Sequence, residues 1–130
     1  MDKSQILTAF NDHFIQFVDD IKRVFPDNND ISLFHTSLGK LRKANPRLMI
    51  LSFKEHVSGI YRTEIEKGNI EFFIDTDYRK YLNEKGVNAP NVLLEKIDCL
   101  REPVRQMNQT DQENVIKYLQ NLTKLSDMYN

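Results

Sequence analysis

Residues 6–26 read ILTAFNDHFIQFVDDIKRVFP, and this stretch decides the fold class. Its apolar side chains recur every three or four residues, which places them on one face of a helix. Ser4 can cap that helix, and Phe25-Pro26 ends it because the residue before a proline avoids helical backbone angles. The pattern predicts an amphipathic helix near 4–24 that packs one face on a core.

Similar signals for helix starts recur along the rest of the chain. Asp30 can cap a second helix, and Asn45-Pro46 is typical of a helix start because proline at the first helical position loses no backbone hydrogen bond. Thr110 and Glu113 have the spacing of a capping box, in which two side chains satisfy backbone N–H groups at the start of a helix. The further predicted helices span 31–44, 46–58, 76–83, 90–107 and 111–128.

Three features interrupt this helical pattern. Gly59 is expected to bend or end the third helix, and Pro103 is expected to kink the fifth or cut it near Arg101. Residues 69–75, NIEFFID, fit a strand, an extended connector or a short helix, because their apolar residues do not alternate with polar ones. The sequence therefore predicts a single compact all-α domain of five or six helices over residues 1–130. Its expected core includes Phe14, Phe17, Leu38, Leu48, Leu51, Leu100 and Leu119.

The composition is typical of a soluble intracellular protein. Of 130 residues, 40% are hydrophobic and 28% are charged, and the net charge is −1. A net charge this small gives no overall attraction to nucleic acid or to an anionic membrane. The longest apolar run, at 48–51, is far shorter than a membrane span, and the N-terminal segment lacks the apolar core of a signal peptide. Cys99 is the only cysteine, so no intrachain disulfide can form.

The sequence contains no recognisable catalytic or metal-binding pattern. His13, His35 and His56 lie on different predicted helices, and none has a second histidine at metal-ligand spacing. The four glycines are scattered and form no phosphate-binding loop. Cys99 has acidic neighbours, which disfavour the thiolate that a nucleophile needs. We therefore expect no enzymatic activity, no cofactor, no metal site and no small-molecule substrate.

The segment 31–54 is locally basic and contains no acidic residue. Its cations are Lys40, Arg42, Lys43, Arg47 and Lys54. Such a segment can bind nucleic acid, since each neutralised phosphate releases counterions. The favoured interpretation is that the cations near residue 44 stabilise the negative end of a helix dipole. Because the segment has no interleaved aromatic residues to stack on bases, any nucleic-acid contact is expected to be weak and salt-sensitive.

Five blocks of sequence carry a family resemblance. They read FNDHFIQFVDDIKRVFPDNNDI at 10–31, LRKANPRLMI at 41–50, FFIDTDYRKYL at 72–82, IDCLREPVRQM at 97–107 and KYLQNLTKLSDMY at 117–129. In this order they resemble an uncharacterised family of small helical proteins encoded by nucleocytoplasmic large DNA viruses. The resemblance implies a role in the virion, in assembly or in the viral factory, within the cytoplasm of a eukaryotic host. It implies no catalytic residue, since the family has no established activity.

The last predicted helix has an apolar stripe that runs to the end of the chain and needs a covering surface. Either the protein's own core or a partner protein can provide it. We expect Tyr118, Leu122, Met128 and Tyr129 to contact a protein partner. A homodimer is the simplest such partner, because twofold association needs only one self-complementary patch. The sequence thus favours a viral interaction or structural module, with a nucleic-acid accessory factor using residues 40–54 as the alternative.

Overall fold

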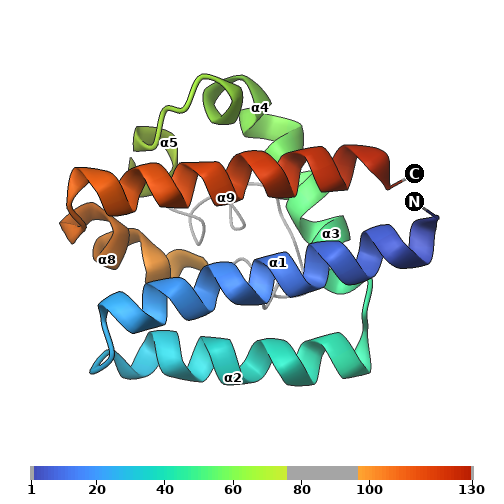
Figure 1. Ribbon diagram of the computed structural model, residues 1–130, viewed down its shortest axis with the longest axis horizontal. Coiled ribbons are helices and arrows are strands. Elements are labelled where there is room, and N and C mark those ends of the chain that lie inside the picture. The colour runs from blue at the N-terminus through green and yellow to red at the C-terminus, as the bar shows by residue number, and fades with distance from the viewer. Residues whose placement is uncertain (1, 76–96, 130) are drawn as a thin grey trace, which may run out of the picture.

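Three long helices lie side by side in the computed structural model, which describes residues 2–75 and 97–129 (Figure 1). The elements are α1 (Lys3–Val24), α2 (Asn29–Ala44), α3 (Leu48–Phe53), the π-helical turn η1 (Lys54–Ser58), α4 (Gly59–Glu66), α5 (Glu71–Asp75), the 3-10 turn η2 (Asp98–Leu100), α8 (Arg101–Gln106) and α9 (Gln109–Met128). Helix α1 lies between α2 and α9, and each of these two runs antiparallel to it.

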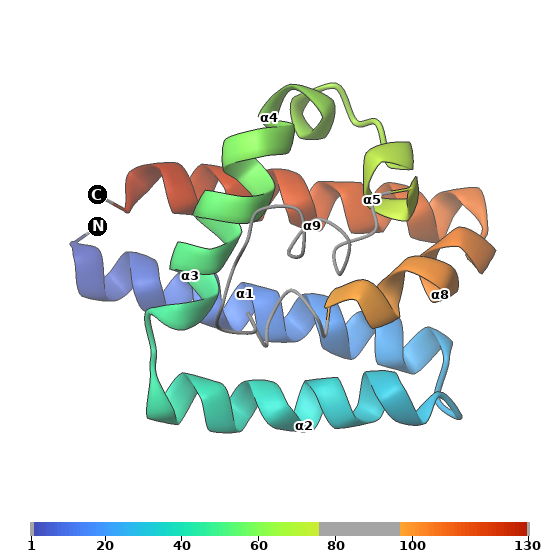
Figure 2. The ribbon, with the colours of Figure 1, turned by 180° about the vertical axis from the view of Figure 1, so that it is seen from behind.

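The shorter elements close the two ends of this layer. Elements α3, η1 and α4 follow one another without a break and cross behind α1 and α9 near the chain termini, while α5 and α8 lie at the opposite end (Figures 1 and 2). The two termini lie side by side, and Lys3 Nζ is 5.7 Å from the centre of the Tyr129 ring. The chain is thus all-α, as the sequence predicts, and it forms one compact domain.

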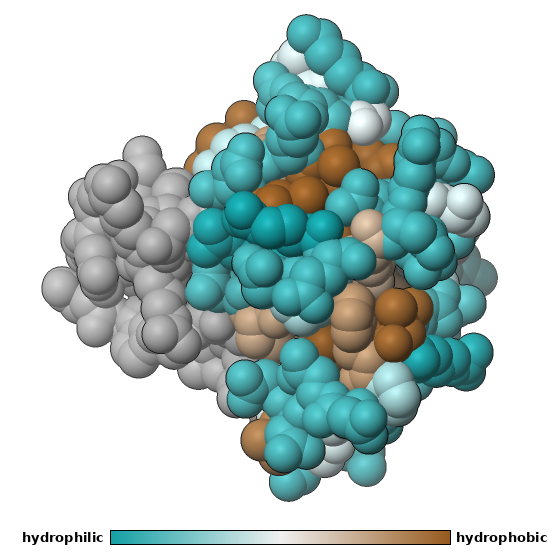
Figure 3. Space-filling view, turned by 90° about the vertical axis from the view of Figure 1, so that its left-hand side faces the viewer, coloured by the Kyte–Doolittle hydropathy of each residue, from teal (hydrophilic) through white to brown (hydrophobic). Residues whose placement is uncertain are grey.

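The core lies between the long helices and the crossing elements. It is rich in phenylalanine: Phe10 packs edge-on against Phe53 with ring centres 5.5 Å apart, and Phe14 packs against Phe34 at 6.5 Å. The outer surface at the end where α1 stops and α9 starts is mostly hydrophilic, with apolar side chains showing in a few places (Figure 3). Burial of these aromatic side chains, together with the aliphatic residues around them, removes apolar surface from water and stabilises the fold.

The core prediction is correct for most of its residues and wrong for Leu51. Phe14, Phe17, Leu38, Leu100 and Leu119 are all buried. The side chain of Leu51 is 48% exposed, and Leu48 is only half-buried. Neighbouring residues in a helix point about 100° apart, so the run LMIL cannot turn every side chain toward one core. Met49 and Ile50 take the buried positions.

Three helices have their N-terminal caps two residues earlier than predicted. The cap of α1 is Asp2 instead of Ser4, and Asp2 forms a capping box with Gln5. The cap of α2 is Asn28 instead of Asp30, and the cap of α9 is Asn108, so Thr110 and Glu113 do not form the predicted capping box. In each case two residues able to cap stand two positions apart, and the earlier one adds further hydrogen-bonded residues to the helix.

The breaks within the helices follow the expected chemistry. Helix α1 ends at Val24, just before Phe25-Pro26. Pro103 lies in the first turn of α8, which starts at Arg101 after a 3-10 turn. Proline is tolerated there because the N–H groups of a first helical turn have no intrahelical partner.

The third predicted helix extends past residue 58, because α4 follows the π-helical turn and continues to Glu66. Gly59, the first residue of α4, has helical backbone angles, so the expected bend is not there; the kink lies two residues later, at Tyr61. The segment 69–75 contains the short helix α5. The predicted helix 76–83 and the first part of the one at 90–107 lie outside the described residues.

Candidate binding groove

The apolar stripe of α9 is covered by the chain itself. Helix α9 packs against α1 on one side and against η1 and α4 on the other, so Leu122 is fully buried. Tyr129 is also buried, and its backbone oxygen accepts a hydrogen bond of 2.6 Å from Lys54 Nζ. Met128, at 49% exposure, points into solvent. The expected partner-binding stripe, and with it the expected homodimer face, is therefore not exposed at Leu122 or Tyr129.

The basic segment is divided by contacts within the chain. Arg42 Nη1 lies 2.6 Å from Asp12 Oδ1 on α1, and Lys54 is bound to the backbone of Tyr129. Lys40, Lys43 and Arg47 are exposed near the end of α2 and the turn that follows. Three of the five candidate phosphate-binding cations therefore remain available to a ligand.

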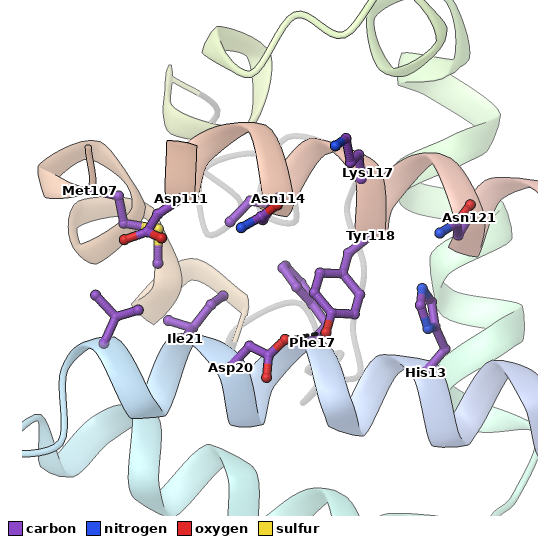
Figure 4. Close-up of a pocket in the computed structure, with 12 residues that line it drawn as sticks. His13, Phe17, Asp20, Ile21, Met107, Asp111, Asn114, Lys117, Tyr118 and Asn121 are labelled. Carbon is purple, nitrogen blue, oxygen red and sulfur yellow. Dashed lines mark hydrogen bonds between the residues drawn. The ribbon is translucent and has the colours of Figure 1, made fainter. Parts of the chain in front are cut away.

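A surface hollow lies between α1 and α9 and was not identified from the sequence. It has a volume of about 510 Å³ and is open to solvent. One wall is formed by α1 and the other by α9, with Met107 from the segment before α9 at one end (Figure 4). Its lining residues are His13, Phe17, Asp20, Ile21, Val24, Met107, Asp111, Asn114, Val115, Lys117, Tyr118 and Asn121.

The groove exists because each wall carries a mixed stripe of side chains. On α1 the lining positions recur every three or four residues from His13 to Val24, and on α9 they do so from Asp111 to Asn121. Residues at this spacing share one face of a helix. Because both faces mix polar with apolar residues, the two helices do not close into a dry interface along this length. The helical spacing of each wall is visible in the sequence, but the sequence does not show that these two walls face each other.

Tyr118 is the central side chain of the groove, and it is held firmly. Its hydroxyl donates a hydrogen bond to the carboxylate of Asp20 on the opposite wall. Its ring contacts Phe17, with ring centres 5.4 Å apart, and His13, at 4.8 Å. Burial and the negative Asp20 raise the pKa of Tyr118 to about 12. The phenol is therefore protonated at neutral pH and serves as a fixed hydrogen-bond donor.

His13 is a half-buried side chain with an unused hydrogen-bonding atom. Its Nε2 is inaccessible to solvent and has no hydrogen-bond partner among the described residues. Burial lowers the pKa of His13, and the nearby Asp20 opposes this effect. The imidazole is consequently neutral at neutral pH. His13 therefore carries no positive charge that could pair with the negative Asp20 carboxylate.

Two carboxylates on opposite walls give the groove its charge. Asp20 projects from α1 and Asp111 from the first turn of α9 (Figure 4). Within the described part of the chain, no side chain forms a hydrogen bond or ion pair with the Asp111 carboxylate. Lys117 lies on the edge of α9 away from α1. The groove lining thus carries two carboxylates, the ammonium group of Lys117 and apolar side chains beside the carboxylates.

Comparison with known proteins adds no further constraint. No family model, curated protein or solved structure matches the chain. Among the described residues, no group of three or more histidine, cysteine and acidic side chains is placed to hold a metal ion. No helix in the same residues is long and apolar enough to cross a membrane. The groove is the feature on which a functional proposal can rest.

Proposed function

We propose that this chain is an interaction module that binds a segment of a partner protein in the groove between α1 and α9. The observation that carries the proposal is a hollow of about 510 Å³ that joins apolar and polar side chains from two helices far apart in sequence. Apolar surface gives a bound chain affinity, and a few placed polar groups fix its orientation. The resemblance to viral proteins supports a role in the virion, in assembly or in the viral factory of a host cell.

The length of the groove favours a peptide segment over a small molecule. It follows α1 from His13 to Val24, about 16 Å at 1.5 Å per helical residue. An extended chain advances about 3.3 Å per residue, so about five residues of a partner fit along it. Asn114 and Asn121 border the groove on α9, and their amides can pair with the peptide groups of such a segment. Tyr118 is the one expected partner-binding residue that lies in this groove.

Nucleic-acid binding is a second candidate, supported by the exposure of Lys40, Lys43 and Arg47. It is supported less well because Arg42 and Lys54 are engaged within the chain. Three exposed cations without stacking aromatic residues give weak, salt-sensitive attraction to phosphate. The protein-binding proposal requires no further side chains, since α1 and α9 already form the groove.

Site-specific cross-linking tests the proposal. A photoreactive phenylalanine analogue is placed at Asn114, on the groove, and in a second protein at Thr36, on the exposed face of α2. Both proteins are cross-linked in extracts of cells that make the protein. We then identify the partners that cross-link from position 114 but not from position 36. Each such partner is purified and titrated with the unlabelled chain.

Blocking the groove provides the quantitative arm of this test. Asn114→Phe fills the groove, and Thr110→Phe adds the same ring on α9 outside it. We expect Asn114→Phe to weaken partner binding at least tenfold and Thr110→Phe to leave it unchanged. Equal cross-linking from both positions, or binding that Asn114→Phe leaves intact, contradicts the proposal.

A further inference from the structure

We propose that the groove selects a partner segment that carries a lysine or arginine, with its cationic group between Asp20 and Asp111. This inference rests on the proposed function and adds the chemistry of the bound residue. Asp20 on α1 and Asp111 on α9 both line the groove, and Lys117, the one lysine among its lining residues, points away from α1 in Figure 4. Charge complementarity therefore points to a basic residue.

The apolar side chains beside the carboxylates fit the stem of such a residue. Ile21 and Met107 lie beside the two carboxylates in Figure 4, and Val24 lines the same groove. Val24 is 43% exposed, although it lies on the inward-facing stripe of α1. Lysine and arginine bury their methylene groups along apolar surface while the charged group reaches a polar partner. Covering Val24 with such a stem removes apolar surface from water and favours binding.

The simplest alternative is that both carboxylates already have their charge balanced. Arg23 is the nearest cation to Asp20, but its Nη1 is 4.0 Å from Asp20 Oδ1, whereas its Nη2 is 2.9 Å from Asp19 Oδ2. Arg23 thus pairs mainly with Asp19. Asp20 uses Oδ2 to accept the Tyr118 hydroxyl, and its Oδ1 accepts no hydrogen bond within the described residues, with Arg23 Nη1 at ion-pair distance only.

The second carboxylate has a weaker partner within the chain. Asp111 interacts favourably with the positive end of the α9 dipole, an effect that is small at an exposed helix start. Both carboxylate oxygens can still accept hydrogen bonds, since no described side chain donates one to them; the backbone N–H of Asp111 donates separately to Asn108 Oδ1. A guanidinium group has five N–H donors and an ammonium group has three, so either can donate to more than one acceptor.

Peptide selection on the full-length protein tests this chemistry. A phage-displayed library of random 12-residue peptides is panned against the protein, and the most enriched peptide is synthesised and titrated by calorimetry. We expect an enriched lysine or arginine next to apolar residues. Replacing that residue by norleucine should weaken binding at least tenfold, and raising the salt concentration should weaken the parent peptide but not the norleucine peptide.

Substitutions in the protein assign the effect to the two carboxylates. Asp111→Asn and Asp20→Asn should each weaken binding at least tenfold. Glu113→Gln, which removes the same charge from α9 outside this groove, should change it less than twofold. Because the asparagine side chain still accepts hydrogen bonds, a loss in the first two variants reports charge, and unchanged melting temperatures exclude loss of the fold.

Three outcomes overturn the inference, and the second and third of them also remove the proposed function. If enriched peptides lack basic residues but Asn114→Phe blocks them, the inference fails and the groove remains a peptide site. If n-butylamine displaces the peptide at equal concentration, the bound group is a small amine instead of a partner segment. If no peptide binds, or none is blocked by Asn114→Phe, both the inference and the proposed function fail.

Discussion

Gly59 is the residue at which the backbone leaves no room for a side chain. The π-helical turn brings the Lys54 carbonyl oxygen to 2.6 Å from where a Cβ on residue 59 would lie. Gly59→Ala should therefore lower the free energy of unfolding, by about 1–3 kcal/mol, because the backbone must shift to relieve the contact. Urea denaturation followed by circular dichroism measures this change.

Gly39 is the matched control for this substitution. It lies on the exposed face of α2 with no atom within 4 Å of an added Cβ. Gly39→Ala should raise the free energy of unfolding by up to about 1 kcal/mol, since alanine is the better helix former. If both substitutions change stability in the same direction, the crowding assigned to Gly59 is wrong.

Asp127 makes stability depend on pH through its contact with Arg62. The Arg62 Nη1 donates to Asp127 Oδ2 at 2.6 Å, and this bond lowers the pKa of the carboxyl. A carboxylate with a lower pKa in the folded state stabilises the fold above its unfolded pKa, and that contribution is lost as pH falls through the folded pKa. Asp127→Asn should therefore lower the melting temperature at neutral pH.

The pH profile separates this effect from a general loss of packing. The difference in melting temperature between wild type and Asp127→Asn should shrink as the pH falls from about 5 to about 2. Asp27→Asn, in the exposed turn after α1, should give a curve parallel to the wild type. A difference for Asp127→Asn that stays constant down to about pH 2 would show that its charge is not involved.

Individual residues were predictable where one face of one helix decides their position. Phe14, Phe17 and Leu38 follow helical spacing and are buried. Leu51 was not predictable in this way, because the run LMIL at 48–51 is apolar on every side and spacing cannot show which side faces the core. The roles of Tyr118 and Asp20 depend on a contact between positions 98 residues apart.

Helix α2 shows how one amphipathic element separates core from surface. Leu38 is fully buried, whereas Leu33 on the same helix is 61% exposed. Leu38→Ala should lower the free energy of unfolding by about 2–5 kcal/mol, because it removes apolar contacts and leaves a cavity. Leu33→Ala should change it by less than about 0.5 kcal/mol. Equal losses in chemical denaturation would contradict the orientation of α2.

At the scale of elements, the sequence located the long helices well and their first residues less well. The spacing of apolar residues extends over several turns, so α1, α2 and α9 are clear. The first residue of each helix depends on which of two nearby residues forms the cap, for example Asn28 or Asp30. The difference in capping preference between two such residues is small. The π-helical turn before Gly59 has no sequence signal beyond the glycine itself.

The whole molecule limits what the basic segment can do. Since Lys43 and Arg47 are exposed, changing each to glutamine should cost less than about 1 kcal/mol of unfolding free energy. We also expect no sub-micromolar binding of duplex DNA at physiological salt by the wild type, because two of the five cations have partners within the chain. Fluorescence anisotropy with a labelled duplex measures this. Tight binding that disappears in the double variant would favour the nucleic-acid function.

The groove is a property of the whole molecule, and for that reason the sequence did not reveal it. Its walls come from the two ends of the chain, and each wall alone resembles an ordinary solvent-facing edge of an amphipathic helix. The sequence instead suggested that the stripe of α9 would meet a partner. In the fold, α1, η1 and α4 cover that stripe, and the polar edge beside it forms the groove.

Mapping of the bound peptide by nuclear magnetic resonance tests the central claim most directly. The full-length protein, labelled with nitrogen-15, is titrated with the selected basic peptide while backbone amide shifts are recorded. We predict that the largest saturating shifts fall on α1 between His13 and Val24 and on α9 between Asp111 and Asn121. Shifts centred on Lys40, Lys43 and Arg47 instead, or an absence of saturating shifts in the groove, would contradict the account.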